Sequence, residues 1–274
     1  MVLPEVLARI DNLELLARTV VQGFLNGLHR SIYLGLSLDF AEHRPYMPGD
    51  DIRRMDWRLY GRTDRHYIKL FEAETNANVV VLLDVSRSMG FGSGSVTKLD
   101  YARFLAASLL YFSRRQRDRV GLITFDEEVV DYVPASARNL NLCLHTLHRA
   151  EARDAGELGR PLRKSAEILR RRGILILISD FYQESEEVLE AVDLLRGAGH
   201  DLMVFHVLDP EELSFPFENT ATFRDMETEE EMPLVPGKVR DGYQGLLRAH
   251  LAELKDRFAG SQTDYAVLDT SSPL

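Results

Sequence analysis

From Val79 onward, runs of consecutive apolar residues alternate with segments whose apolar residues recur every three or four positions. The first pattern is typical of strands buried on both faces, and the second of amphipathic helices. The strand-like runs are VVVLLD, DRVGLITFD, GILILISD, HDLMVFHVLDP and TDYAVLDT. The helix-like segments are KLDYARFLAASLLYFSRR, with Thr97 as its expected cap, then NLNLCLHTLHRA, RPLRKSAEILRRR, SEEVLEAVDLLRGAG and DGYQGLLRAHLAELKDRFAG. This alternation predicts an α/β fold with a doubly wound, mostly parallel sheet covered by helices on both faces.

Two further segments of this region have strand patterns of another kind. EVVDYVPAS predicts a short edge strand that forms a hairpin with the strand DRVGLITFD. ATFRDMETEEEMPL predicts a separate hairpin before the last helix.

The first 76 residues differ in texture from the rest of the chain. Residues 1–30 have apolar side chains at helical spacing, interrupted by Glu, Arg and Asp, and predict one amphipathic helix. Residues 31–76 mix short alternating segments with turn residues such as Pro48 and Gly49, which predicts an irregular β-rich module. We therefore expect three units: the helix 1–30, the module 31–76, and an α/β domain 77–274 that includes the last hairpin, helix and strand.

Composition narrows the class of protein. The formal net charge of −10 argues against a nucleic-acid binder, because such proteins neutralise phosphates with Lys and Arg. Cys143 is the only cysteine, which excludes an internal disulfide and a Cys-rich zinc site. Apolar stretches all fall short of the roughly 18 residues that span a bilayer. We expect a cytoplasmic protein with no membrane insertion.

Carboxylates follow several of the predicted strands. In an open, mostly parallel sheet, ligands bind beyond the carboxyl ends of the strands, where the winding direction reverses. Four aspartates stand at such strand ends, and they are Asp84, Asp126, Asp180 and Asp209. For Asp126 and Asp209 we expect the common role of capping a turn or a helix through backbone hydrogen bonds.

Asp84 begins a denser group of polar side chains. Ser86 and Ser88 follow it at alternate positions, so in an extended loop all three would point the same way. Asp180 would join them from a neighbouring strand. Carboxylate and hydroxyl oxygens are the ligands that Mg²⁺ prefers, and Mn²⁺ and Ca²⁺ use the same kind of donor. The pattern predicts a divalent-cation site, with one coordination position open to an outside oxygen.

The motif DVSRSM, followed by SD after a second apolar strand, resembles the metal-ion-dependent adhesion site of von Willebrand factor A domains. The upstream segment PYMPGDDIRRMDWRLYGRTDRHYIKLFEAE resembles the signature of the bacterial family called domain of unknown function 58. This resemblance implies a von Willebrand factor A-like, Rossmann-type fold. It also implies a MoxR-type AAA+ ATPase, or its client protein, as the partner.

One loop departs from the pattern of those domains. The resemblance implies a threonine ligand near Gly156, but no threonine lies between His148 and Gly173. Glu157 is the expected replacement, as a ligand directly or through a water, and Asp154 is also close. Loss of the threonine would otherwise leave a weak site or none.

Two functions follow from these residues. The leading hypothesis is a non-enzymatic interaction module whose cation, held by Asp84, Ser86, Ser88 and Asp180 with Glu157, binds an acidic side chain of a partner. The alternative is a Mg²⁺-dependent phosphohydrolase or phosphotransferase with Asp84 as nucleophile. Enzymes that resemble haloacid dehalogenases carry a second aspartate where this chain has Ser86, and a serine cannot replace that general acid.

Overall fold

The computed structural model describes most of the chain. The described residues are 2–10, 12–30, 42–45, 67–70, 77–153, 155–183, 185–218, 221–224, 231–261 and 263–274. Most of the predicted β-rich module 31–76 therefore lies outside the described residues. Its two described strands, β1 (Glu42–Pro45) and β2 (Tyr67–Leu70), pair antiparallel.

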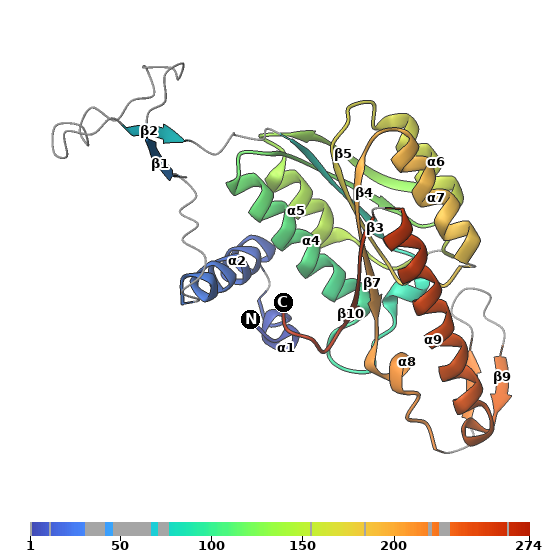
Figure 1. Ribbon diagram of the computed structural model, residues 1–274. Coiled ribbons are helices and arrows are strands. Elements are labelled where there is room, and N and C mark those ends of the chain that lie inside the picture. The colour runs from blue at the N-terminus through green and yellow to red at the C-terminus, as the bar shows by residue number, and fades with distance from the viewer. Residues whose placement is uncertain are drawn as a thin grey trace.

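A six-stranded sheet forms the centre of the molecule (Figure 1). Its strands, in spatial order, are β10 (Asp264–Asp269), β7 (Asp201–Leu208), β6 (Ile174–Ser179), β3 (Asn78–Asp84), β4 (Arg119–Phe125) and β5 (Val129–Ser136). All neighbours are parallel except β4 and β5, which form the predicted edge hairpin. The chain winds from β3 toward β5, then crosses back to β6 and winds toward β10. The winding thus reverses between β3 and β6, and the predicted doubly wound α/β class is confirmed.

Helices cover both faces of this sheet (Figure 1). On one face lie α4 (Lys98–Arg115) and α5 (Leu140–Arg149), and on the other lie α6 (Gly159–Ile168), α7 (Ser185–Gly197) and α9 (Pro236–Gly260). Side chains of β3 alternate between the two resulting cores, because successive residues of a strand point to opposite faces. Val79, Val81 and Leu83 join the α4 side, and Val80 and Leu82 join the other.

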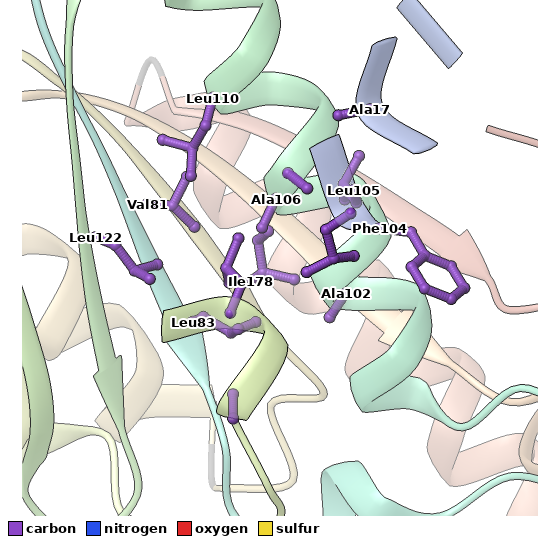
Figure 2. Close-up of a cluster of buried hydrophobic side chains, with 14 of the residues drawn as sticks. Ala17, Val81, Leu83, Ala102, Phe104, Leu105, Ala106, Leu110, Leu122 and Ile178 are labelled. Carbon is purple, nitrogen blue, oxygen red and sulfur yellow. The ribbon is translucent and has the colours of Figure 1, made fainter. Parts of the chain in front are cut away.

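The core on the α4 side shows why the central strands are apolar along their whole length. Figure 2 shows Val81 and Leu83 of β3 and Leu122 of β4 facing Ala106 and Leu110 of α4. All five side chains are fully buried. Burial of a Leu or Val side chain contributes about 1.5–3 kcal/mol, so each such contact favours this packing of helix on sheet.

The N-terminal region corrects one expectation. Residues 1–30 form two helices, α1 (Pro4–Leu7) and α2 (Leu13–Arg30), instead of one. The side-chain oxygen of Asn12 accepts hydrogen bonds from the backbone N–H groups of Glu14 and Leu15, which starts a second helix at Leu13. Leu7 and Leu16 are fully buried in the same core as β3 and α4, so these helices pack onto the α/β domain.

The C-terminal region contains one element that the sequence did not predict. A short helix, α8 (Pro210–Ser214), follows β7 directly. The hairpin predicted before the last helix is present as β8 (Ala221–Arg224) and β9 (Glu231–Leu234). Backbone hydrogen bonds in both directions join Val2 to Leu274, so the two ends of the chain lie together (Figure 1). Among the helices described, none combines the length and the apolar character needed to cross a membrane.

Candidate cation site at the β3–β6 edge

The carboxyl ends of β3 and β6 bring Asp84 and Asp180 to the same edge of the sheet. Leu83 pairs with Ile178 in the parallel register, so Asp84 and Ser179 end their strands at the same level. The Ser179 hydroxyl donates a hydrogen bond of 2.6 Å to Asp84 Oδ2. Asp180 follows immediately, and both carboxylates are almost fully buried, at 1% and 2% exposure. The predicted meeting of the two strand ends is therefore present.

The loop after β3 brings the two serines to the same place. The backbone N–H of Ser86 donates to Asp84 Oδ1 over 2.8 Å, and the Ser86 and Ser88 hydroxyl oxygens lie 3.2 Å apart. The sequence predicted an extended loop, but the loop is extended only in part. A single 3₁₀ turn, η2 (Arg87–Gly90), carries Ser88 back toward Ser86. Asp84, Ser86 and Ser88 thus converge through a turn instead of through strand-like alternation.

The surroundings of Asp84 favour its neutral form or a bound cation. Burial raises the pKa of this carboxyl, and the nearby charge of Asp180 raises it further. Hydrogen bonds from Ser179 and Ser86 act in the opposite direction, and the resulting pKa is about 7. A carboxylate that is withdrawn from water beside a second carboxylate requires a proton or a positive charge.

Asp180 already has a positive partner, which the sequence analysis missed. Lys98 is fully buried, and its ammonium lies 2.7 Å from Asp180 Oδ2 and 2.8 Å from Glu212 Oε1. The same nitrogen lies 4.5 Å from the centre of the Tyr182 ring, a cation–π contact. Burial alone would lower the pKa of Lys98, but the charges of Asp180 and Glu212 outweigh it and raise the pKa, so the ammonium stays charged.

The position of Lys98 in its helix was a signal that could have been noticed. Lys98 is the first residue of α4, where a positive charge opposes the helix dipole. Thr97 caps this helix through a capping box with Asp100, which confirms the expected cap. The box sets the start of α4 at Lys98. A lysine in this unfavourable position points to acidic partners elsewhere in the fold.

The other two aspartates at strand ends have the capping roles expected of them. Asp126 Oδ1 accepts from the backbone N–H of Glu128 in a tight turn. Asp209 caps α8 by accepting from the backbone N–H of Glu211, and its second oxygen accepts from the N–H of Ser93. Neither joins Asp84, and the capping interpretation is confirmed for both.

The loop between α5 and α6 approaches the site through its backbone. A Cβ added to Gly156 would lie only 2.8 Å from Ser86 Cβ, which is closer than packed carbon atoms approach. The backbone here thus takes the space in which a threonine side chain was expected. Glu157 is exposed, and its Oε1 accepts a hydrogen bond from the N–H of Arg160 at the start of α6, so its role as a ligand stays a prediction. Asp154 lies outside the described residues.

The donor set at this edge fits a hard divalent cation. Asp84, Ser86, Ser88 and Asp180 offer carboxylate and hydroxyl oxygens, which suit Mg²⁺ or Mn²⁺. Only two of the four are carboxylates, and one oxygen of Asp180 already bonds to Lys98. The described part of the chain holds no group of three or more His, Cys, Asp or Glu side chains suited to a metal. A cation here would therefore depend on hydroxyl donors as well.

A family model and several proteins of known sequence match this chain. The family model described as "Protein of unknown function DUF58" matches residues 42–253. The uncharacterized protein Rv1480 of Mycobacterium tuberculosis is 27% identical over 269 residues, covering 94% of this chain and 82% of that protein. The uncharacterized protein Mb1516 of Mycobacterium bovis matches to the same extent.

Solved structures share the fold at low sequence identity. An aerotolerance-related membrane protein from Bacteroides fragilis is 17% identical, with a TM-score of 0.50 over 71% of this chain and 92% of that one. BatB from Bacteroides thetaiotaomicron is 18% identical, with a TM-score of 0.49 over 70% and 90%. The von Willebrand factor A domain of SpRpn10 is 13% identical, with a TM-score of 0.41 over 72% and 89%. The match to the Bacteroides fragilis protein is one of fold.

Replacement of Lys98 by methionine should destabilise the protein strongly. The change removes the ammonium but keeps an apolar side chain of similar length, so Asp180 and Glu212 lose their buried counter-charge. We expect a loss of about 3–5 kcal/mol in the free energy of unfolding, measured by urea denaturation. The matched control is Lys164→Met, which breaks an exposed pair with Glu167 and should cost about 1 kcal/mol or less. Equal losses in the two variants would contradict the role given to Lys98.

Proposed function

This chain belongs to the family described as protein of unknown function DUF58, and we propose that it is a non-enzymatic interaction protein. In this proposal the β3–β6 edge presents a divalent cation to an acidic side chain of a partner. The observation that supports it most is the meeting of Asp84, Ser86, Ser88 and Asp180 at the point where the sheet reverses its winding. Ligands of doubly wound sheets bind at this point.

The residues around Asp84 have separate roles in this proposal. Hydrogen bonds from Ser179 and from Ser86 orient the Asp84 carboxylate. Ser86 and Ser88 would supply hydroxyl oxygens to the cation. The cation would supply positive charge to the buried carboxylates and an open position for a partner's oxygen.

The same contacts favour binding over the phosphohydrolase alternative. A nucleophilic carboxylate needs an oxygen that is free to attack phosphorus, but both oxygens of Asp84 accept hydrogen bonds from the protein. Ser86, in the place of the general acid, shares its hydroxyl with Ser88 instead of standing free. These features suit a carboxylate that orients a cation.

We propose a MoxR-type AAA+ ATPase, or its client protein, as the partner. This part of the proposal is supported by the sequence segment that resembles the family signature, Pro45 to Glu74. Contact between a cation and a carboxylate is reversible and depends on charge. It can therefore give specificity to a partner that binds and is released repeatedly.

Cation binding can be tested by titrating the protein with Mn²⁺ or Mg²⁺ in a calorimeter. We expect saturable binding to the unaltered protein, and at least about tenfold weaker binding to Asp84→Asn, since the variant loses a charged ligand. The control is Asp126→Asn, which alters an aspartate at the next strand end that only caps a turn. Absence of saturable binding to the unaltered protein would refute the cation site.

The affinity for the cation should rise with pH around neutrality. The proton competes with the cation for Asp84, whose pKa is about 7 in the protein without metal. The carboxyl is mostly protonated at pH 6 and mostly ionised at pH 8, so the affinity should rise by roughly tenfold over this interval. In Asp84→Asn the rise should disappear. An equal rise in the variant would assign the pH dependence to another group.

Capture of the partner tests the function itself. The purified protein should retain a purified MoxR-type ATPase from the same organism in the presence of Mg²⁺, and lose it when a chelator is added. Asp84→Ala should abolish retention, whereas Asp126→Ala should leave it unchanged. Retention that survives both the chelator and Asp84→Ala would rule out a bridging cation, even if the two proteins associate.

A further inference from the structure

The side chain of Gln183 lies next to Gly156, the residue of the α5–α6 loop that has no side chain where a threonine was expected. The position of the missing Cβ of Gly156 lies 3.1 Å from Ser86 Oγ and 3.4 Å from Gln183 Nε2. Ser86 Oγ and Gln183 Nε2 therefore both lie close to Gly156, next to the cation site. Gln183 comes from the loop after β6, three residues beyond Asp180.

Hydrogen bonding fixes which end of the Gln183 amide faces the loop. Nε2 donates to the backbone carbonyl oxygen of Gly156 over 3.3 Å. That carbonyl can only accept a hydrogen bond, so the amide nitrogen has to face it and Oε1 has to point elsewhere. Oε1 is buried and has no hydrogen-bond partner among the described residues. A buried acceptor without a partner costs about 1–3 kcal/mol, so this oxygen requires a partner from outside the described residues, such as a water or a cation.

We propose that Gln183 Oε1 is an oxygen ligand of the cation and takes the place of the expected threonine hydroxyl. This inference rests on the cation site proposed above and adds a ligand to it. Amide oxygens are hard donors of the kind that Mg²⁺, Mn²⁺ and Ca²⁺ accept. A neutral amide also keeps the charge of the site as a threonine would, whereas the Glu157 carboxylate would have added a negative charge.

Phe181 and Ser185, on either side of Gln183 in the sequence, both make contacts that hold them in place. Phe181 is fully buried and has a left-handed backbone conformation, with φ of 47°. Its N–H donates to the Ser179 hydroxyl, and its carbonyl accepts from His250 Nε2 of α9. The Ser185 hydroxyl, at the start of α7, contacts Nδ1 of the same histidine. A strained residue held in this way is common at binding sites.

The test compares Mn²⁺ binding to the unaltered protein, Gln183→Met and Gln183→Glu. Gln183→Met keeps the length of the side chain but removes the oxygen, so the affinity should fall about tenfold or more. Water should then fill the position, which would raise the water-proton relaxation caused by bound Mn²⁺. Gln183→Glu keeps an oxygen ligand but loses the donor to the Gly156 carbonyl, so its affinity for Mn²⁺ should fall less than that of Gln183→Met. The control is Gln116→Met, a change of the exposed glutamine that ends α4.

The possible results distinguish failure of the cation site from failure of Gln183 as its ligand. If the unaltered protein binds no Mn²⁺, the cation site and the role of Gln183 both fail. If Asp84→Asn weakens binding while Gln183→Met changes neither affinity nor relaxation, the cation site stands and Gln183 is not a ligand. A loss of affinity in Gln183→Met without added water would also overturn the inference, because it would show only an effect on packing.

Discussion

Two carboxylates removed from water at adjacent strand ends form the constraint around which this edge of the molecule is arranged. Burial and the nearby charge of Asp180 raise the pKa of Asp84, so charging Asp84 at this place carries a cost. The fold reduces it with neutral donors on Asp84 and with the buried ammonium of Lys98 on Asp180. Because Lys98 also binds Glu212, the same charge connects the start of α4, the end of β6 and helix α8. An interaction network of this kind ties the geometry of the site to the packing of three elements.

The capping boxes explain how so few residues hold this network in place. Thr97 and Asp100 set the first residue of α4 and hence the position of Lys98. Asp209 and Glu212 form a second box at α8, in which one Glu212 oxygen accepts from the N–H of Asp209 and the other accepts from Lys98. Glu212 therefore has a local role in starting α8 and a tertiary role in neutralising Lys98. A change at any one of these residues would therefore alter the contact between Lys98 and Asp180.

The sequence predicted the features that depend on local pattern and failed for those that depend on the packed fold. The strands and helices of the α/β domain were predictable because strands buried on both faces are apolar throughout and helices are periodic. Asp84 and Asp180 were predictable because parallel strands end at one edge. Lys98 and Gln183 were not, since a lysine after a glycine-rich loop and a glutamine before a helix read as surface residues. The break between α1 and α2 was missed because the apolar spacing continues across Asn12.

The glycine at position 156, in place of the expected threonine, removes one ligand and also changes how the loop packs against Ser86. The close approach of Gly156 to Ser86 leaves no room for a side chain, so the loop backbone and the Gln183 amide occupy that side of the site. On the opposite side, Lys98 takes one oxygen of Asp180. Both features reduce what the site offers a cation, one by removing a hydroxyl and the other by sharing a carboxylate. A neutral amide oxygen at Gln183 restores a donor without adding charge to a region where burial already opposes it.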